Sequence, residues 1–160
     1  MEEYLLDTKW KIWYHSINDS SWKNSSYKMI YGINNLYDLK IVRDKIQSNH
    51  LQNGMFFVMK EDIFPTWEYV DNREGCCISF KVPASQLLNE WNSIFIKIVT
   101  NEIFKEKSKI NELNGFSISP KKEFNIIKLW LKNDNKNYEE FINEHEPFFI
   151  KSKSIHKKHF

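Results

Sequence analysis

Glycine is scarce in this chain of 160 residues, which contains only four. Phosphate-binding loops of nucleotide hydrolases and dinucleotide-binding turns need two or three glycines within about six residues, because side chains would keep the backbone away from the phosphates. The glycines of this chain lie far apart, at Gly32, Gly54, Gly75 and Gly115. The sequence therefore excludes both kinds of nucleotide site.

Cysteine is rarer still, and long apolar runs do not occur. Cys76 and Cys77 are the only cysteines, and as neighbours in a strand they would point to opposite faces, so we expect no disulfide. Free thiols are typical of a reducing compartment. No apolar run approaches the roughly 20 residues of a membrane span, and the opening Met1-Glu2-Glu3 is acidic where a signal peptide is basic. We expect a cytoplasmic protein with no membrane partner.

Arginine is nearly absent, since Arg43 and Arg73 are the only two. Lysine supplies the remaining positive charge, and Ile and Asn are abundant, as is typical of an AT-rich genome such as that of a virus or parasite; a viral protein would work in the host cytoplasm. The net charge of +2 does not by itself indicate a nucleic-acid partner. The lysine- and histidine-rich segment 151–160 is either a solvated end or an edge that faces phosphate.

Hydrophobic residues make up 41% and charged residues 28% of the chain, as in a globular protein. At this length one apolar core forms without disulfides or metal, so we expect a single domain over residues 1–160 and a monomer.

Residues that could carry catalysis form no catalytic motif. Cys77 would need a histidine partner in an electropositive cleft to act as a nucleophile, and no motif identifies one. His156 and His159 are three residues apart, as zinc ligands on one helix face can be, but the segment is rich in lysine and has no acid beside it. We therefore expect no enzyme activity, no catalytic residue, no metal and no cofactor.

Hydrophobic periodicity predicts an α+β fold. Strands are expected at 10–15, 27–31, 54–60, 77–82, 115–119 and 124–131, with a last strand from Phe148. Helices are expected at about 34–47, where Asn34 or Asn35 can cap the first turn, at 85–98 and at 138–145. This order favours an antiparallel sheet with three helices packed on one side.

Two of the six tryptophans are not explained by core packing. Four lie inside predicted strands or helices, whereas Trp22 and Trp67 lie in polar loops. An isolated tryptophan in a loop is more often a core anchor than a ligand platform. Two loop tryptophans at the same edge of a sheet make a ligand-binding role more favoured than it would be for one alone.

Six landmarks occur in order along the chain: Trp10-x-x-Trp13, Trp22 in the following loop, Pro65-x-Trp67-Glu68 leading to Asn72-x-x-Gly75, Trp91, Gly115 and Trp130. With these landmarks the chain resembles the eukaryotic translation initiation factor 4E family, the mRNA cap-binding proteins, over nearly its whole length. The resemblance implies a curved antiparallel sheet of about eight strands, three helices on its convex face, and the cap of mRNA held on the concave face.

The resemblance also implies which residues recognise the 7-methylguanosine base. Trp22 and Trp67 would stack on its two faces, because methylation at N7 makes the ring cationic and adds cation–π attraction to stacking. Glu68 would accept hydrogen bonds from guanine N1–H and N2–H₂, and the Trp67 backbone N–H would donate to O6. Trp130 would lie beside the methyl group.

The phosphate half of the family site is matched poorly. Lys121 stands where the family has one arginine, but Cys77 replaces a second arginine and Ile126 replaces a lysine. Each lost charge-assisted hydrogen bond costs about 1.5–3 kcal/mol. We expect Lys121 and Lys128 to bind the phosphates, with Lys122 and the Lys157-Lys158 pair as helpers.

The convex face departs from the family as well. In the family, a scaffold or repressor protein binds there as a helix and contacts a tryptophan on the first helix and a leucine on the second helix of the cap-binding protein. At these two positions this chain has Lys40 and Asn92, whereas Leu36 and Ile96 remain apolar. We therefore expect any such protein partner to be altered. Besides cap binding in translation initiation, two readings remain open: a protein-interaction module of the same fold with a vestigial cap pocket, and an enzyme acting on the cap, for which no metal-binding carboxylate cluster is present.

Overall fold

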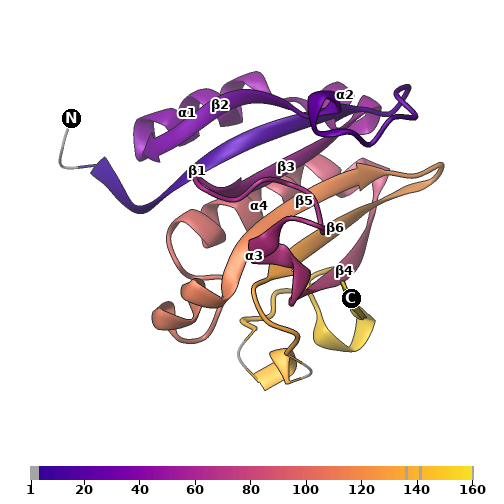
Figure 1. Ribbon diagram of the computed structural model, residues 1–160. Helices are drawn as coiled ribbons and strands as arrows, with labels where there is room; N and C mark the ends of the chain where they lie inside the picture. The colour runs from indigo at the N-terminus through magenta and orange to yellow at the C-terminus, as the bar shows by residue number, and fades with distance from the viewer. Residues whose placement is uncertain (1–3, 136, 141, 160) are drawn as a thin grey trace.

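Seven strands pair into one antiparallel sheet in the computed structural model (Figure 1), which describes residues 4–135, 137–140 and 142–159. Their order across the sheet is β2-β1-β3-β5-β6-β4-β7, and every pairing is antiparallel. The strands are β1 (Leu5–Ser16), β2 (Lys28–Asn35), β3 (Gly54–Lys60), β4 (Cys76–Pro83), β5 (Leu113–Pro120), β6 (Phe124–Leu131) and β7 (Ile155–Lys158).

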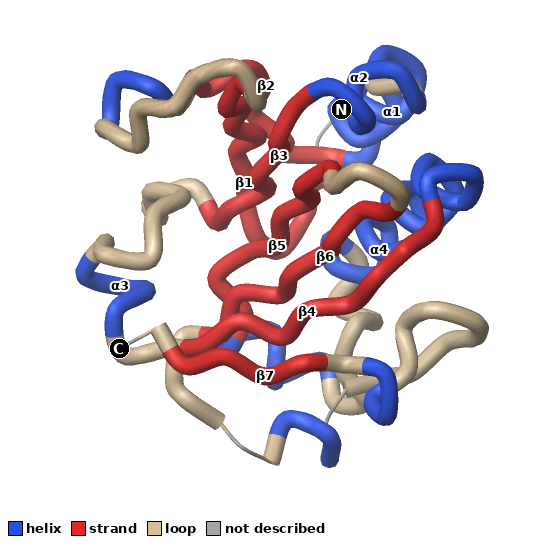
Figure 2. Tube along the Cα trace, turned by 90° about the vertical axis from the view of Figure 1, so that its right-hand side faces the viewer, coloured by secondary structure: helices blue, strands red, loops and turns tan. Residues whose placement is uncertain are grey.

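Three α-helices cover one side of the sheet, as Figure 2 shows: α1 (Leu36–Lys45), α2 (Ser48–Asn53) and α4 (Leu87–Val99). The short helix α3 (Val70–Arg73) and the loops after β1 and β3 lie on the other side. Short 3₁₀ turns occur at Asn24–Ser26, Ala84–Gln86, Lys107–Glu112, Tyr138–Glu140 and Lys151–Lys153. No helix among the described residues is long and apolar enough to cross a membrane.

Alternation along the strands divides the apolar side chains between two clusters. In β3, Phe56 and Val58 belong to the main core under the helices, whereas Phe57 and Met59 belong to a smaller cluster on the opposite face. Strand β6 follows the predicted alternation, with Ile127, Leu129 and Leu131 in the main core and Trp130 in the smaller cluster. The sheet is therefore apolar on both faces, and the smaller cluster is the floor of the concave side.

Helix α4 supplies most of the helical side of the core. Trp91 is fully buried, with its ring centroid 5.2 Å from that of Phe116 in β5 and 5.4 Å from that of Phe95. Asn35 caps α1 as predicted, because its side chain accepts a hydrogen bond of 2.8 Å from the Asp38 backbone N–H.

The structure corrects three expectations about the elements. The sheet has seven strands in the described residues, where the resemblance implied about eight. The third helix on the convex side is α2 and not 138–145; in that segment Ile142 forms an extended bridge with Phe104, so only Tyr138–Glu140 is helical among its described residues. The last strand begins at Ile155 and not at Phe148, because His145 and Phe149 close a turn.

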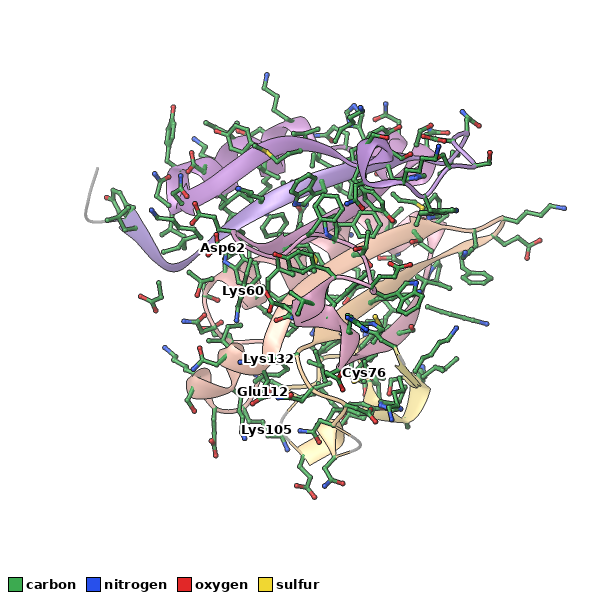
Figure 3. All side chains as sticks on the ribbon, viewed as in Figure 1. Lys60, Asp62, Cys76, Lys105, Glu112 and Lys132 are labelled. Atoms are coloured by element: carbon green, nitrogen blue, oxygen red, sulfur yellow. The ribbon has the colours of Figure 1, made fainter. Side chains whose placement is uncertain are left out.

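Lys60 at the end of β3 is partly buried near Glu112 and Lys132 (Figure 3). Burial, followed by the charge of Lys132, lowers the pKa of Lys60 to about 8, while its Nζ donates a 2.8 Å hydrogen bond to the Ile110 carbonyl. Below pH 8 the folded protein thus holds a disfavoured charge, and between about pH 8 and 10.5 it loses a proton that the unfolded chain keeps. The free energy of unfolding should therefore rise with pH in that window.

We expect this rise to be smaller in Lys60→Met, by on the order of 1–2 kcal/mol after allowing for partial exposure. Urea unfolding at pH 7.5 and at higher pH would measure it, with the exposed Lys40→Met as control. Equal pH dependence in the wild type and in Lys60→Met would contradict the prediction.

Candidate functional site

A cavity of about 660 Å³ opens on the concave side of the sheet, within the size range of small-molecule sites. It lies over the smaller apolar cluster, between the loop after β1, the loop after β3 and strand β7. Aromatic residues, one carboxylate and three lysines line it: Trp22, Tyr27, Met55, Phe57, Pro65, Thr66, Trp67, Glu68, Cys77, Ser79, Lys128, Trp130, Lys157, Lys158 and His159. The two loop tryptophans therefore reach the same cavity, as the sequence predicted.

Trp22 is held by ring contacts with His15 and Tyr27. Its ring stacks on His15 with centroids 4.1 Å apart and planes 10° from parallel, and 55% of the residue remains exposed. His15 is fully buried, and its two ring nitrogens lie 2.8 Å from the carbonyl oxygens of Ser16 and Ser21. The histidine thus supports one indole face and leaves the indole able to accept a flat ligand.

The loop that carries Trp67 is shaped by a buried amide. Asn72 is fully buried, and its Nδ2 donates to the carbonyl oxygens of Phe64 at 3.0 Å and of Thr66 at 2.8 Å. Asn114 from β5 in turn donates to Asn72 Oδ1 at 2.9 Å. The Asn72 landmark is therefore structural: it ties the loop to the sheet and places Trp67, 45% exposed, at the cavity.

Trp130 lies in the floor of the cavity. It is 6% exposed, and its Nε1 donates a 3.0 Å hydrogen bond to Ser117 Oγ in the neighbouring strand. Tyr27 belongs to the same cluster, where its ring contacts Phe57, and burial, followed by the charge of Glu68, raises the pKa of Tyr27 to about 12. The phenol therefore stays neutral at physiological pH, and Glu68 is a carboxylate facing an aromatic cavity.

The expected phosphate ligands divide into two groups. Lys128 and Lys157 line the cavity, joined by Lys158. Lys121 and Lys122 lie instead in the exposed turn between β5 and β6, outside the cavity lining. Four strand residues lie between the end of this turn and Lys128, so the two are about 17 Å apart along the strand. Lys121 therefore does not reach the cavity lining, although it aligns with a phosphate-binding position in the family resemblance.

Cys77, which replaces a family arginine, has a histidine partner that the sequence did not reveal. Its Sγ lies 2.9 Å from His159 Nε2, and His159 Nδ1 lies 2.7 Å from the Asn72 carbonyl. Burial lowers the pKa of His159 and raises the pKa of Cys77 to about 12, although the charges of Lys128 and Lys157 act in the opposite direction on the thiol. The neutral imidazole therefore donates through Nδ1 to Asn72 and accepts the Cys77 S–H, so this thiol is not an activated nucleophile.

Sequence reasoning also missed Tyr27 and His159 as cavity residues. Tyr27 could have been found from its place directly after the serine-rich loop of Trp22. His159 gave no such indication, because only the pairing of β7 with β4 brings this end of the chain to the cavity.

The four residues expected to meet a protein partner lie on the helical side. Leu36 and Lys40 on α1 are exposed, and Asn92 and Ile96 on α4 are partly exposed. Tyr37, next to Leu36, is 63% exposed. The convex face thus keeps an exposed apolar pair at the start of α1.

The model of the family described as eukaryotic initiation factor 4E matches residues 5–154. A curated eukaryotic translation initiation factor 4E of Dictyostelium discoideum is 27% identical over 137 residues, which cover 81% of this chain and 53% of that protein, so the chain spans about half the length of this relative.

A similar fold occurs in the complex of Ascaris suum eIF4E-3 with the m7G cap, with a TM-score of 0.74 and 18% identity; the match covers 84% of this chain and 77% of that chain. Another occurs in the complex of C. elegans eIF4E-3 with the 4E-binding protein Mextli, with a TM-score of 0.73 and 19% identity; the match covers 82% of this chain and 76% of that chain. A schistosome eIF4E complexed with m7GpppG and 4E-BP is similar too, with a TM-score of 0.74 and 15% identity over 84% of this chain and 75% of that chain. These likenesses agree with the curved antiparallel sheet and its helices. Because the family model matches nearly the whole chain, the protein belongs to the eukaryotic initiation factor 4E family.

Proposed function

We propose that this protein binds the 7-methylguanosine 5′ cap of mRNA in translation initiation or its control, with the methylated base stacked between Trp22 and Trp67. The observation that carries the proposal is the pair of half-exposed indoles at one cavity. A cationic methylated base between two indoles gains about 1–3 kcal/mol per aromatic partner. The related proteins of Ascaris suum and Schistosoma, solved with the m7G cap and with m7GpppG, support the same ligand class.

Glu68 supplies base selectivity in this proposal. Its carboxylate accepts from N1–H and N2–H₂ of guanine together, a pair of donors that adenine lacks. The Trp67 backbone N–H donates to O6, and Trp130 in the floor contacts the methyl group. The base half of the site is then complete within this chain.

The test is the quenching of intrinsic tryptophan fluorescence by 7-methylguanosine triphosphate, compared with GTP. We expect saturable quenching by the methylated nucleotide and at least tenfold weaker binding of GTP, because the unmethylated ring is not cationic. Quenching by neither nucleotide, or equal quenching by both, would refute cap recognition.

For the phosphates, we propose Lys128 and Lys157 as the main ligands, because they line the cavity whereas Lys121 and Lys122 do not. Lys128→Ala and Lys157→Ala should each weaken binding of 7-methylguanosine triphosphate by about 1 kcal/mol, roughly fivefold, and more at low salt. Binding of the uncharged 7-methylguanosine nucleoside should change little. Lys121→Ala is the matched control, and a larger loss in this variant than in Lys128→Ala would reverse the assignment.

The alternative of a protein-interaction module with a vestigial pocket draws on the exposed Leu36 and Tyr37 of α1. The likeness to a nematode protein solved with the 4E-binding protein Mextli makes a protein partner on some face of this chain a reasonable second proposal. Retention of the wild type on a cap-analogue resin, lost in Trp67→Ala, would count against a vestigial pocket. Absence of retention together with capture of a partner that Leu36→Asp disrupts would favour the module.

A further inference from the structure

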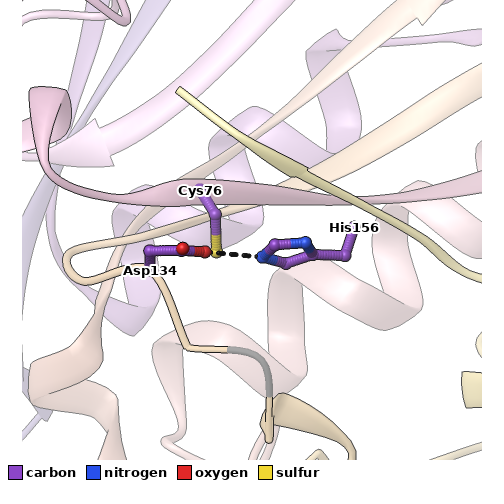
Figure 4. A group of neighbouring side chains, drawn as sticks. All are labelled: Cys76, Asp134 and His156. Carbon is purple, nitrogen blue, oxygen red and sulfur yellow. Dashed lines mark hydrogen bonds and ion pairs between the residues drawn. The ribbon is translucent and has the colours of Figure 1, made fainter. Parts of the chain in front are cut away.

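Three metal-ligating side chains from distant parts of the chain converge beside the edge strand β7 (Figure 4). Cys76 comes from β4, Asp134 from the segment after β6, and His156 from β7. Their ligand atoms all lie within 4.8 Å of one another, and His156 Nε2 is 2.7 Å from Asp134 Oδ1. Among the described residues this is the one group of three such side chains that could share a metal ion.

The donor set selects the kind of metal. A thiolate and an imidazole together favour zinc over magnesium or calcium, and a carboxylate is also a common zinc ligand. Tetrahedral zinc, with bonds of about 2.0–2.3 Å, places its ligand atoms about 3.3–3.6 Å apart. The 2.7 Å between His156 Nε2 and Asp134 Oδ1 is shorter than this, and no pair of ligand atoms is farther apart than 4.8 Å, so side-chain adjustment would bring all three atoms to one zinc ion.

Burial and support of the ligands suit an ordered site with one open position. Cys76 is fully buried, whereas the side chains of His156 and Asp134 keep 24% and 17% of their accessible surface, so water can reach the fourth position. Tyr138 stacks on the His156 ring with planes 10° from parallel, and its hydroxyl is 2.7 Å from Ser154 Oγ. The ring contact with Tyr138, whose hydroxyl is itself held by Ser154, restrains the orientation of the imidazole.

We propose that Cys76 Sγ, the Asp134 carboxylate and His156 Nε2 bind one Zn²⁺, with water as the fourth ligand. Cys76 releases its proton to solvent on binding, His156 binds as the neutral imidazole, and bonds to the metal replace the hydrogen bond between His156 and Asp134. This inference is independent of the cap proposal. It replaces the sequence expectation of no metal: His156 does have an acid beside it, supplied by the fold and not by the neighbouring sequence.

The site would fasten the last strand to the sheet. Strand β7 has four residues, lies at the edge of the sheet and pairs only with β4 within the described residues. A shared metal ties it to β4 and to the segment after β6. Because Lys157 and His159, which line the cavity, directly follow His156 in the chain, zinc should order that wall of the cavity.

The test uses the full chain, stripped of metal under reducing conditions and titrated with Zn²⁺ in competition with a chromophoric chelator. We expect one zinc per chain and a rise in Tm with zinc. Co²⁺ in place of Zn²⁺ should give the visible bands of a tetrahedral ion and a thiolate charge-transfer band. No stoichiometric zinc on the wild type would overturn the proposal.

The variants separate this site from its neighbour. Cys76→Ser and Asp134→Asn should lose stoichiometric zinc, whereas Cys77→Ser should keep it, because Cys77 and His159 form a cysteine–histidine pair of the same chemistry on the other face of β4. Asp134→Asn retains a polar partner for His156. It is the test variant if circular dichroism shows that Cys76→Ser does not fold. Loss of zinc in Cys77→Ser with retention in Asp134→Asn would refute the assignment.

Discussion

Trp67→Ala and Trp22→Ala should each weaken the binding of 7-methylguanosine triphosphate by roughly 5- to 150-fold. Each substitution removes one wall of the proposed stack, worth about 1–3 kcal/mol. The phosphate half of the site cannot compensate, because only lysines line it and Cys77 stands where the family resemblance places an arginine. The loss should therefore exceed the effect of either lysine substitution. Isothermal titration calorimetry with 7-methylguanosine triphosphate would measure it.

The controls for this prediction separate stacking from folding. Tyr37→Ala removes an exposed aromatic side chain from α1, outside the cavity, and should bind as the wild type does. Trp67→Phe keeps a smaller ring and should retain weakened binding. Wild-type thermal stability in both alanine variants would show that the fold is intact, and cap affinity within threefold of the wild type in either would disprove the stacked arrangement.

The loop that carries Trp67 and Glu68 could be predicted from the sequence because a local motif forms it. Pro65-x-Trp67-Glu68 and Asn72 lie within eight residues, and the hydrogen bonds from Asn72 to the Phe64 and Thr66 carbonyls fix the loop from within. The place of such residues depends little on distant parts of the chain. The spacing within this motif therefore predicted that Trp67 and Glu68 lie together in one loop, and both line the cavity.

The phosphate half and the end of the chain could not be predicted in the same way. Whether a lysine reaches the cavity depends on strand register: Lys128 pairs opposite Ser79, which lines the cavity, whereas Lys121 lies beyond the end of the strand. Likewise, the pairing of Cys77 with Lys157 across β4 and β7 brings His159 to the thiol. These contacts join residues about fifty to eighty positions apart, and no local pattern specifies them.

The fold shows the same division. The strands and the amphipathic helix α4 were predictable because their apolar residues recur with the spacing of the side chains that the fold buries. Helix α2 was not, because its six residues are mostly polar and a reciprocal capping pair of Gln47 and His50 begins it. The segment after β6 was predicted as a helix, but long-range contacts with Ile103 and Phe104 override its local preference.

Gly75→Ala should be among the most destabilising single substitutions in the chain. A Cβ at this position would lie 1.9 Å from the Leu131 carbonyl oxygen and 3.0 Å from that of Lys132, and backbone atoms cannot rotate aside as a side chain can. Strand β4 would have to separate from β6 at its first residue, where Cys76 pairs with Leu131. We expect a loss of at least about 2–3 kcal/mol in the free energy of unfolding, measured by urea denaturation.

Gly32→Ala is the matched control, since a Cβ there meets nothing within 4 Å. Its unfolding free energy should stay within about 1 kcal/mol of the wild type, with the smaller entropy of the unfolded chain favouring alanine. Equal stability of the two variants would mean that the approach of Gly75 to Leu131 is not a constraint. Because Gly75 precedes both Cys76 and Cys77, the same displacement should weaken zinc binding on one face of β4 and cap binding on the other, whereas Trp67→Ala should affect the cap alone.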